Sequence, residues 1–93
     1  MAVLMRAQAP GLTREGYEAV TDDPAFMEAL RNFDGFIGLH AAGPTDDGWQ
    51  VFEVWESAAR HQAWIEQVIA PKMPPGAAGS MSVVYYDLHK AIL

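Results

Sequence analysis

Apolar residues along the chain follow two spacings, and the changes between them mark the predicted elements. Four short segments are rich in β-branched, aromatic and other apolar residues and are bounded by Gly, Pro or Asp, which is typical of β-strands. They are Ala2 to Ala9, Phe36 to Ala42, Trp49 to Glu56 and Met81 to His89. Because the Gly- and Asp-rich segment Gly43 to Gly48 separates the middle two, we predict an antiparallel hairpin there.

The segments between these strands carry helical spacing and helix-start signals. Thr13 is the predicted N-cap of a helix over Arg14 to Thr21, and Asp23 followed by Pro24 predicts a second start. The first helical region is therefore expected to break near Asp22. Ser57 is the predicted cap of a later helix, which places on one broad face Ala58, His61, Trp64, Ile65, Val68 and Ile69. We expect Pro71 to end it and the segment Pro71 to Ser80 to form a loop.

The resulting order, βαββαβ, predicts the fold class. Two βαβ units with right-handed crossovers give an α+β, ferredoxin-like fold, in which a four-stranded antiparallel sheet carries both helical regions on one face. A chain of 93 residues has room for one such domain, so residues 1–93 are taken as a single unit.

Both faces of the predicted sheet are apolar. Large apolar residues occupy the odd positions Val3, Met5, Ile37, Leu39, Val51, Trp55, Val83 and Tyr85, and the even positions Leu4, Phe36, Phe52, Val54, Val84, Tyr86 and Leu88. Leaving one set in water would forfeit about 1.5–3 kcal/mol for each large side chain. We therefore predict that a second subunit covers the free sheet face, most simply as a homodimer.

Composition narrows the classes of function. The chain is 51% hydrophobic, but no apolar run approaches the roughly 20 residues of a membrane span, so a folded, cytoplasmic protein is expected. It has no Cys, which excludes disulfides, thiolate metal sites and thiol nucleophiles. Its net charge of −6 and its scattered basic residues argue against binding to nucleic acid.

The segment from Phe36 to Ser57, together with the following helix up to Pro71, resembles the dimeric α/β-barrel superfamily and, within it, the antibiotic-biosynthesis-monooxygenase-like (ABM-like) proteins. The resemblance implies that two sheets face one another across a dimer and that each subunit can hold a ligand between its sheet and its helices. Such relatives include cofactor-free quinone-forming monooxygenases, haem-degrading enzymes and proteins without demonstrated activity. In these relatives an apolar or aromatic residue usually stands where this chain has His61.

Two histidines are the candidate catalytic groups. His61 shares the inward helix face with Trp64, where an imidazole could move protons near neutral pH, or could simply be hydrogen-bonded at the helix edge. His40 is predicted at the end of the second strand, where it could line the mouth of a cavity or be solvated.

Aromatic and acidic residues are the candidate ligand-binding groups. Four aromatic residues could form flat walls for an aromatic ligand, or could be core residues only: Trp55, Trp64, Tyr85 and Tyr86. Glu53 lies in a strand expected to be central, where its carboxylate could act as a base or could pair with an Arg across the dimer interface.

No cofactor or metal is predicted. His40, His61 and His89 come from separate elements without the paired spacing of a metal motif. The haem-degrading relatives pair a pocket His with an Asn on the first strand, whereas the only Asn here is Asn32, near the end of the first helical region.

Two functions remain open at this stage. The first is a cofactor-independent monooxygenase or related enzyme that acts on an aromatic, polyketide-like small molecule, with His61 or His40 as the base. The second is a non-catalytic dimer that binds a small metabolite or stabilises a partner protein.

Overall fold

The computed structural model describes residues 1–73 and 80–92. In chain order, its main elements are β1 (Val3–Pro10), α1 (Arg14–Thr21), α2 (Pro24–Asn32), β2 (Phe36–Pro44), β3 (Gly48–Trp55), α3 (Ala58–Trp64) and β4 (Ser82–Asp87). After α3 the helix continues through a π-helical turn, Ile65–Ile69, and a 3-10 turn, Ala70–Lys72. Of the predicted loop, residues 74–79 lie outside the described residues. No helix in the described ranges is long and apolar enough to cross a membrane.

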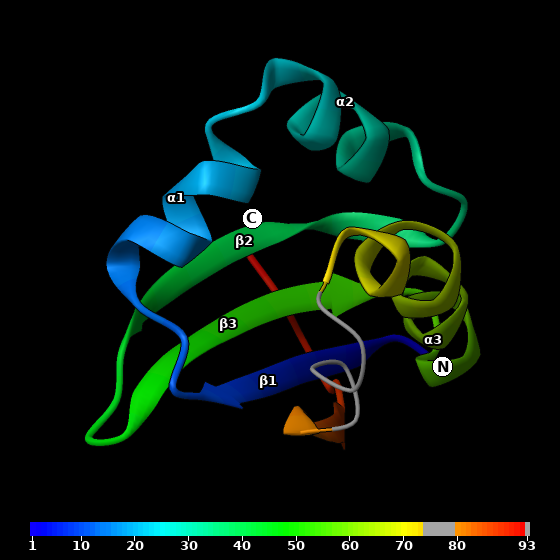
Figure 1. Cartoon of the computed structure of the whole chain (residues 1–93). Coiled ribbons are helices and arrows are strands. Elements are labelled where there is room, and N and C mark those ends of the chain that lie inside the picture. The colour runs from blue at the N-terminus through cyan, green and yellow to red at the C-terminus, as the bar shows by residue number, and fades with distance from the viewer. Residues whose placement is uncertain (74–79, 93) are drawn as a thin grey trace.

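The four strands form one antiparallel sheet in the order β2-β3-β1-β4. All three α-helices lie on the same side of this sheet (Figure 1). The predicted ferredoxin-like α+β fold is therefore confirmed.

The predicted helix caps hold the helices in place. The side chain of Thr13 accepts a hydrogen bond from Gly16 N at 3.1 Å. Asp23 accepts one from Ala25 N at 3.0 Å, and Ser57 one from Arg60 N at 3.3 Å. Since Asp23 caps a separate helix, the first helical region is broken between α1 and α2, as the sequence predicted.

The odd-numbered residues of β1, β3 and β4 face the helices. Val3, Met5, Ala7 and Trp55 form a buried cluster with Phe26 and Leu30 of α2 and with Trp64 of α3. Ring contacts hold this cluster together: Phe33 meets Trp64 and Trp55 edge-on, at centroid distances of 5.2 and 6.0 Å. The core thus lies beneath α2 and α3.

Strand β2 departs from this odd-numbered pattern because its pairing with β3 shifts twice, between Phe36 and Gly38 and between Gly38 and His40. At the second shift Leu39 has a φ of +60°, a left-handed conformation that costs a non-glycine residue about 1–2 kcal/mol. As a result Ile37 and Leu39 are exposed, while His40 lies opposite Glu53.

Gly48 at the start of β3 is expected to tolerate no side chain. A Cβ there would overlap Ala9 O and lie 2.8 Å from Gly11 N, both backbone atoms. Gly48→Ala should therefore lower the free energy of unfolding in urea by roughly 1–3 kcal/mol. Gly43 has no heavy atom within 4 Å of its would-be Cβ, so Gly43→Ala is the matched control and should change stability little. Equal effects of the two substitutions would contradict this account.

Candidate functional site

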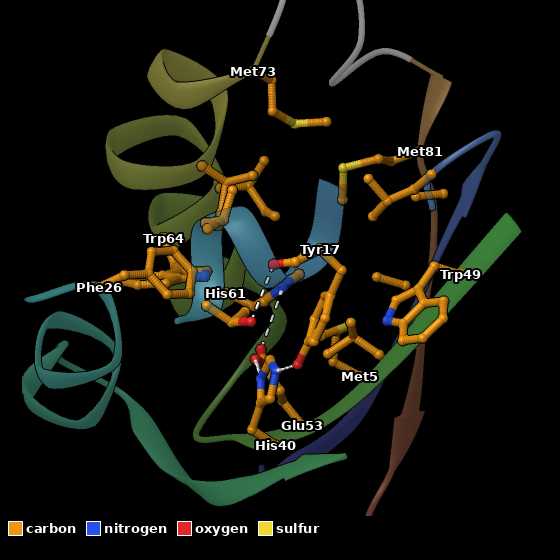
Figure 2. A pocket seen from close by; sticks show the side chains of 18 of the residues that line it. Met5, Tyr17, Phe26, His40, Trp49, Glu53, His61, Trp64, Met73 and Met81 are labelled. Atoms are coloured by element: carbon orange, nitrogen blue, oxygen red, sulfur yellow. Dashed lines mark hydrogen bonds and ion pairs between the residues drawn. The ribbon is translucent and has the colours of Figure 1, made fainter. Parts of the chain in front are cut away.

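A cavity of about 160 Å³ lies between the sheet and the helices (Figure 2). Four aromatic rings form much of its wall: those of Tyr17, Phe26, Trp49 and Trp64. Aliphatic and methionine side chains line most of the remainder, among them Met5, Val20, Val51, Ile65, Ile69, Met73 and Met81. Such a lining favours a flat, largely apolar ligand.

A chain of three polar side chains opens on this cavity. His40 Nδ1 lies 2.6 Å from Glu53 Oε2, and His40 Nε2 lies 2.5 Å from the hydroxyl oxygen of Tyr17. Because a carboxylate can only accept, Nδ1 carries the proton, and Nε2 is left to accept a hydrogen bond from Tyr17. Figure 2 shows the three groups joined at one side of the pocket. A Tyr–His–Glu chain of this kind can move a proton from the cavity to an imidazole stabilised by a carboxylate.

The neighbouring strands place this chain where it is. His40 on β2 and Glu53 on β3 are direct cross-strand partners, and Tyr17 reaches them from α1. Tyr17 also stacks against the His40 ring, at a centroid distance of 5.9 Å and an angle of 13°. The side chain of Glu53 is only 4% exposed, and its second oxygen, Oε1, accepts a hydrogen bond from Trp55 Nε1 at 3.0 Å. The carboxylate is thus held by a donor on each oxygen.

His61 lies near the other carboxylate oxygen of Glu53, Oε1, and forms a separate hydrogen-bonded pair with Tyr85. Its Nε2 lies 4.0 Å from Glu53 Oε1, beyond hydrogen-bond range, and its Nδ1 lies 2.7 Å from the hydroxyl of Tyr85. The ring is 1% exposed, and burial lowers the pKa of His61 to about 4, against the opposing pull of Glu53. The imidazole is therefore neutral at neutral pH. We assign its proton to Nε2, the nitrogen that faces Glu53 Oε1, so that Nδ1 accepts from the hydroxyl of Tyr85.

The hydroxyl groups of Tyr17 and Tyr85 are both protonated at neutral pH. Burial raises the pKa of Tyr17, and it raises the pKa of Tyr85 as well. Tyr17 consequently stands as a hydrogen-bond donor to His40 until a proton is taken from it.

The predicted site residues fall into two groups. His40, Glu53, His61 and Trp64 line the cavity. The other predicted aromatic residues, Trp55, Tyr85 and Tyr86, are not among the described residues that line it. Trp55 is fully buried behind the wall, and Tyr85 bonds His61.

His40 differs from its predicted position in the strand. The sequence placed it at the end of a strand closing at Ala42, but β2 continues to Pro44, so His40 is an internal strand residue. No Arg pairs with Glu53 within the described part of this subunit, and the cationic neighbours of the carboxylate are the two imidazoles when protonated.

Two cavity residues are not predicted by the sequence. Tyr17 lies within the predicted helix Arg14 to Thr21, and Trp49 is the first residue of a predicted strand, but neither was identified as a site residue. The position of Trp49, an odd residue on the same strand as Glu53 and Trp55, is the signal that could have placed it on the same face.

Residues 1–73 and 80–92 contain no cluster of side chains that could bind a metal ion. No group of three or more His, Asp or Glu there could hold an ion, and His89 lies beyond β4 and is exposed.

Comparison with known proteins bears on the fold. No protein-family model matches the chain, and a search of the curated proteins gives no match. Among solved structures, the chain is similar to the crystal structure of a monooxygenase from the gene ActVA-Orf6 of Streptomyces coelicolor in complex with the ligand Nanaomycin D. The identity is 21%, the TM-score is 0.58, and the alignment covers 99% of this chain and 90% of that one. The chain thus shares the fold of this monooxygenase structure, as expected from the resemblance of its hairpin and following helix.

Proposed function

We propose that the protein is a monooxygenase that oxidises a phenolic, polyketide-like aromatic compound with dioxygen and without a cofactor. The observation that carries the proposal is the Tyr17–His40–Glu53 chain, which opens on a cavity with aromatic walls. An apolar cavity with one convergent set of polar groups is the usual form of a small-molecule site.

The first step is removal of the phenolic proton. The substrate hydroxyl donates its proton to the Tyr17 oxygen while Tyr17 passes its own to His40 Nε2. The products are a bound phenolate and an imidazolium, and the imidazolium is stabilised by the carboxylate of Glu53 at 2.6 Å. His40 is preferred to His61 as the base, because burial lowers the pKa of His61 to about 4 and its Nδ1 is engaged by Tyr85.

The second step uses the phenolate as the reductant. The electron-rich ring gives one electron to dioxygen, and the radical pair combines to form a carbon–oxygen bond. The resulting peroxide takes the proton back from His40. Loss of the proton on that ring carbon, with cleavage of the O–O bond, leaves a carbonyl and one water. A phenol with one ring C–H and one molecule of dioxygen thereby become a quinone and one water, and both electrons that reduce the second oxygen come from the substrate.

The walls of the cavity provide the remaining requirement, which is to hold a flat ring and exclude water. Trp64 is 2% exposed and packs against Phe26, with ring centroids 5.4 Å apart, so one wall is rigid. The similar monooxygenase structure, which holds Nanaomycin D, supports a small-molecule ligand for a fold of this kind.

Dioxygen consumption tests the proposal. The protein would be incubated in air with a panel of anthrones, hydroquinones and naphthols, while dioxygen uptake and product mass are recorded. The expected result is uptake of one dioxygen per molecule of product, with one oxygen atom from labelled dioxygen retained in that product. Saturable binding without uptake across the panel would refute catalysis and favour the second hypothesis, a metabolite-binding protein.

We also propose that the protein is a homodimer, joined through the sheet face opposite the helices. This face exposes Ile37, Leu39, Val84 and Tyr86, each between 41% and 47% exposed. It also carries Arg6, whose Nε is buried without a hydrogen-bond partner within the described part of one subunit. Clustered apolar exposure beside an unsatisfied donor supports a partner surface.

Ile37→Glu tests the dimer. The β3 residues beside this position are Trp55 and Val54, so a carboxylate there would be desolvated in the interface without a basic partner, and the variant should elute and scatter light as a monomer where the parent is a dimer. Gln67→Glu introduces the same charge at an exposed helix position and should leave the dimer intact. A monomeric parent protein at tens of micromolar would refute this assembly.

A further inference from the structure

The cavity contains one hydrogen-bond donor that nothing in the described part of the protein uses. Trp49 Nε1 is buried, yet it has no hydrogen-bond partner among the described residues. The other indole of the same strand, Trp55, donates to Glu53 at 3.0 Å. Buried donors are nearly always paired, so an unpaired one on a cavity wall indicates a group that the ligand supplies.

The hydroxyl and imidazole groups of the cavity lining are already engaged in hydrogen bonds. Tyr17 bonds His40, His40 bonds Glu53, and His61 bonds Tyr85. The hydroxyl of Thr21 donates to the backbone oxygen of Tyr17 at 3.1 Å. Among the described lining residues, Trp49 Nε1 is the buried side-chain donor without a partner, and it is therefore available to an incoming molecule.

The position of the indole directs this donor toward the ligand. Trp49 lines the cavity, and its ring lies 5.3 Å from that of Tyr17 at an angle of 33°. Figure 2 shows the indole nitrogen on the side of Tyr17 and Met5, toward the pocket. An indole N–H can only donate, so the ligand atom that meets it must be an acceptor.

We propose that Trp49 is a specificity-determining residue, whose N–H selects aromatic ligands that carry a carbonyl oxygen in addition to a hydroxyl. The hydroxyl donates to the oxygen of Tyr17, and the carbonyl accepts from Trp49 Nε1. A phenol without the second oxygen leaves the indole N–H unpaired and binds less tightly. This inference rests on the proposed function, because it uses the same cavity and the same hydroxyl contact.

A matched pair of small phenols tests the selection. Para-hydroxyacetophenone and para-ethylphenol have nearly the same shape, and only the first has a carbonyl. Their dissociation constants would be measured by calorimetry for the parent protein and for Trp49→Phe, which keeps an aromatic ring and removes the donor. The ketone preference should be roughly fivefold to tenfold greater in the parent than in the variant, the size of one net hydrogen bond. The acidity difference between the two phenols is present in both proteins and cancels in this comparison.

A second measurement uses only the parent protein, so it does not depend on whether the Trp49→Phe variant folds. In the parent protein, the indole N–H resonance of Trp49 should move downfield when the ketone binds and much less when ethylphenol binds. The resonance of Trp55, which is not among the described residues that line the cavity, serves as the internal reference. Glu56→Gln, an exposed substitution outside the described cavity lining, should leave the ketone preference unchanged.

The outcomes separate the two proposals. An equal ketone preference in the parent and in Trp49→Phe, or an unmoved Trp49 resonance in the ketone complex, would overturn the role of Trp49 while leaving the cavity as a phenol site. Failure of both phenols to bind the parent protein would overturn both proposals.

Discussion

Replacing Glu53 by Gln is expected to lower kcat by about 10²- to 10⁴-fold while leaving ligand affinity within a few-fold of the parent value. Glu53 does not touch the proposed reacting hydroxyl. It acts through His40, whose Nδ1–H it accepts at 2.6 Å.

The reason for so large an effect is the tautomer of His40. In the Glu53→Gln variant the single amide oxygen would remain opposite Trp55 Nε1, a donor 3.0 Å from the present carboxylate, so the amide NH2 would face His40. His40 would then have to accept at Nδ1 and carry its proton on Nε2, where it could no longer take a proton from Tyr17. The imidazolium formed during the reaction would also lose its counter-charge.

The control is Glu56→Gln, which removes the same charge three residues along the chain at an exposed position. It should change neither kcat nor affinity appreciably. The decisive result is a loss of kcat without a matching loss of ligand affinity, because a merely structural role of Glu53 would lower both. Retention of full turnover by the Glu53→Gln variant would remove the proton-transfer chain from the mechanism.

The secondary structure was predictable because its signals are local. Thr13, Asp23 and Ser57 each accept a hydrogen bond from a backbone N–H two or three residues later. The start of each of the three helices is therefore determined by a few consecutive residues. The apolar character of both sheet faces was equally local, although what covers the second face is a property of an assembly rather than of one subunit.

The site could be predicted only in part because its geometry depends on register. The pairing shifts on either side of Gly38 decide that His40, rather than Leu39, faces Glu53, and no apolar alternation in Phe36 to Ala42 signals them. Tyr17 and His40 are 23 residues apart in the sequence, and the periodicity of apolar residues does not predict contacts over such a separation. Glu53 and His61, by contrast, were identified because ionisable residues stood at positions that the pattern assigned to the interior.

Lowering the pH is expected to destabilise the protein through His61. The pKa of this imidazole is lowered to about 4 by burial, from an ordinary value of 6.5. Between these two values the unfolded chain binds a proton that the folded protein does not, so stability falls as the pH falls. The contribution is fully present above about pH 6.5 and is lost as the pH falls through about 4.

The size of the effect follows from the separation of the two values. A shift of one pKa unit corresponds to about 1.4 kcal/mol, so this group should reduce the free energy of unfolding by about 2–3 kcal/mol between roughly pH 7.5 and roughly pH 4.5. The groups that face the imidazole are Glu53, whose Oε1 lies 4.0 Å from Nε2, and the hydroxyl of Tyr85 at Nδ1. Protonation of Nδ1 would remove the acceptor for Tyr85 and leave a charge in a ring that is 1% exposed.

His61→Asn isolates this group, because the amide oxygen can still accept from Tyr85 but does not titrate. Urea unfolding of both proteins across this pH range gives two stability curves, and carboxylates that titrate in both cancel in their difference. The advantage of the parent over the variant should shrink by about 2–3 kcal/mol toward acid pH, whatever the two stabilities are at neutral pH. Parallel curves would mean that His61 takes up its proton at the same pH in the folded and the unfolded protein. The lowered pKa of His61 could then no longer be used as a reason to prefer His40 as the base.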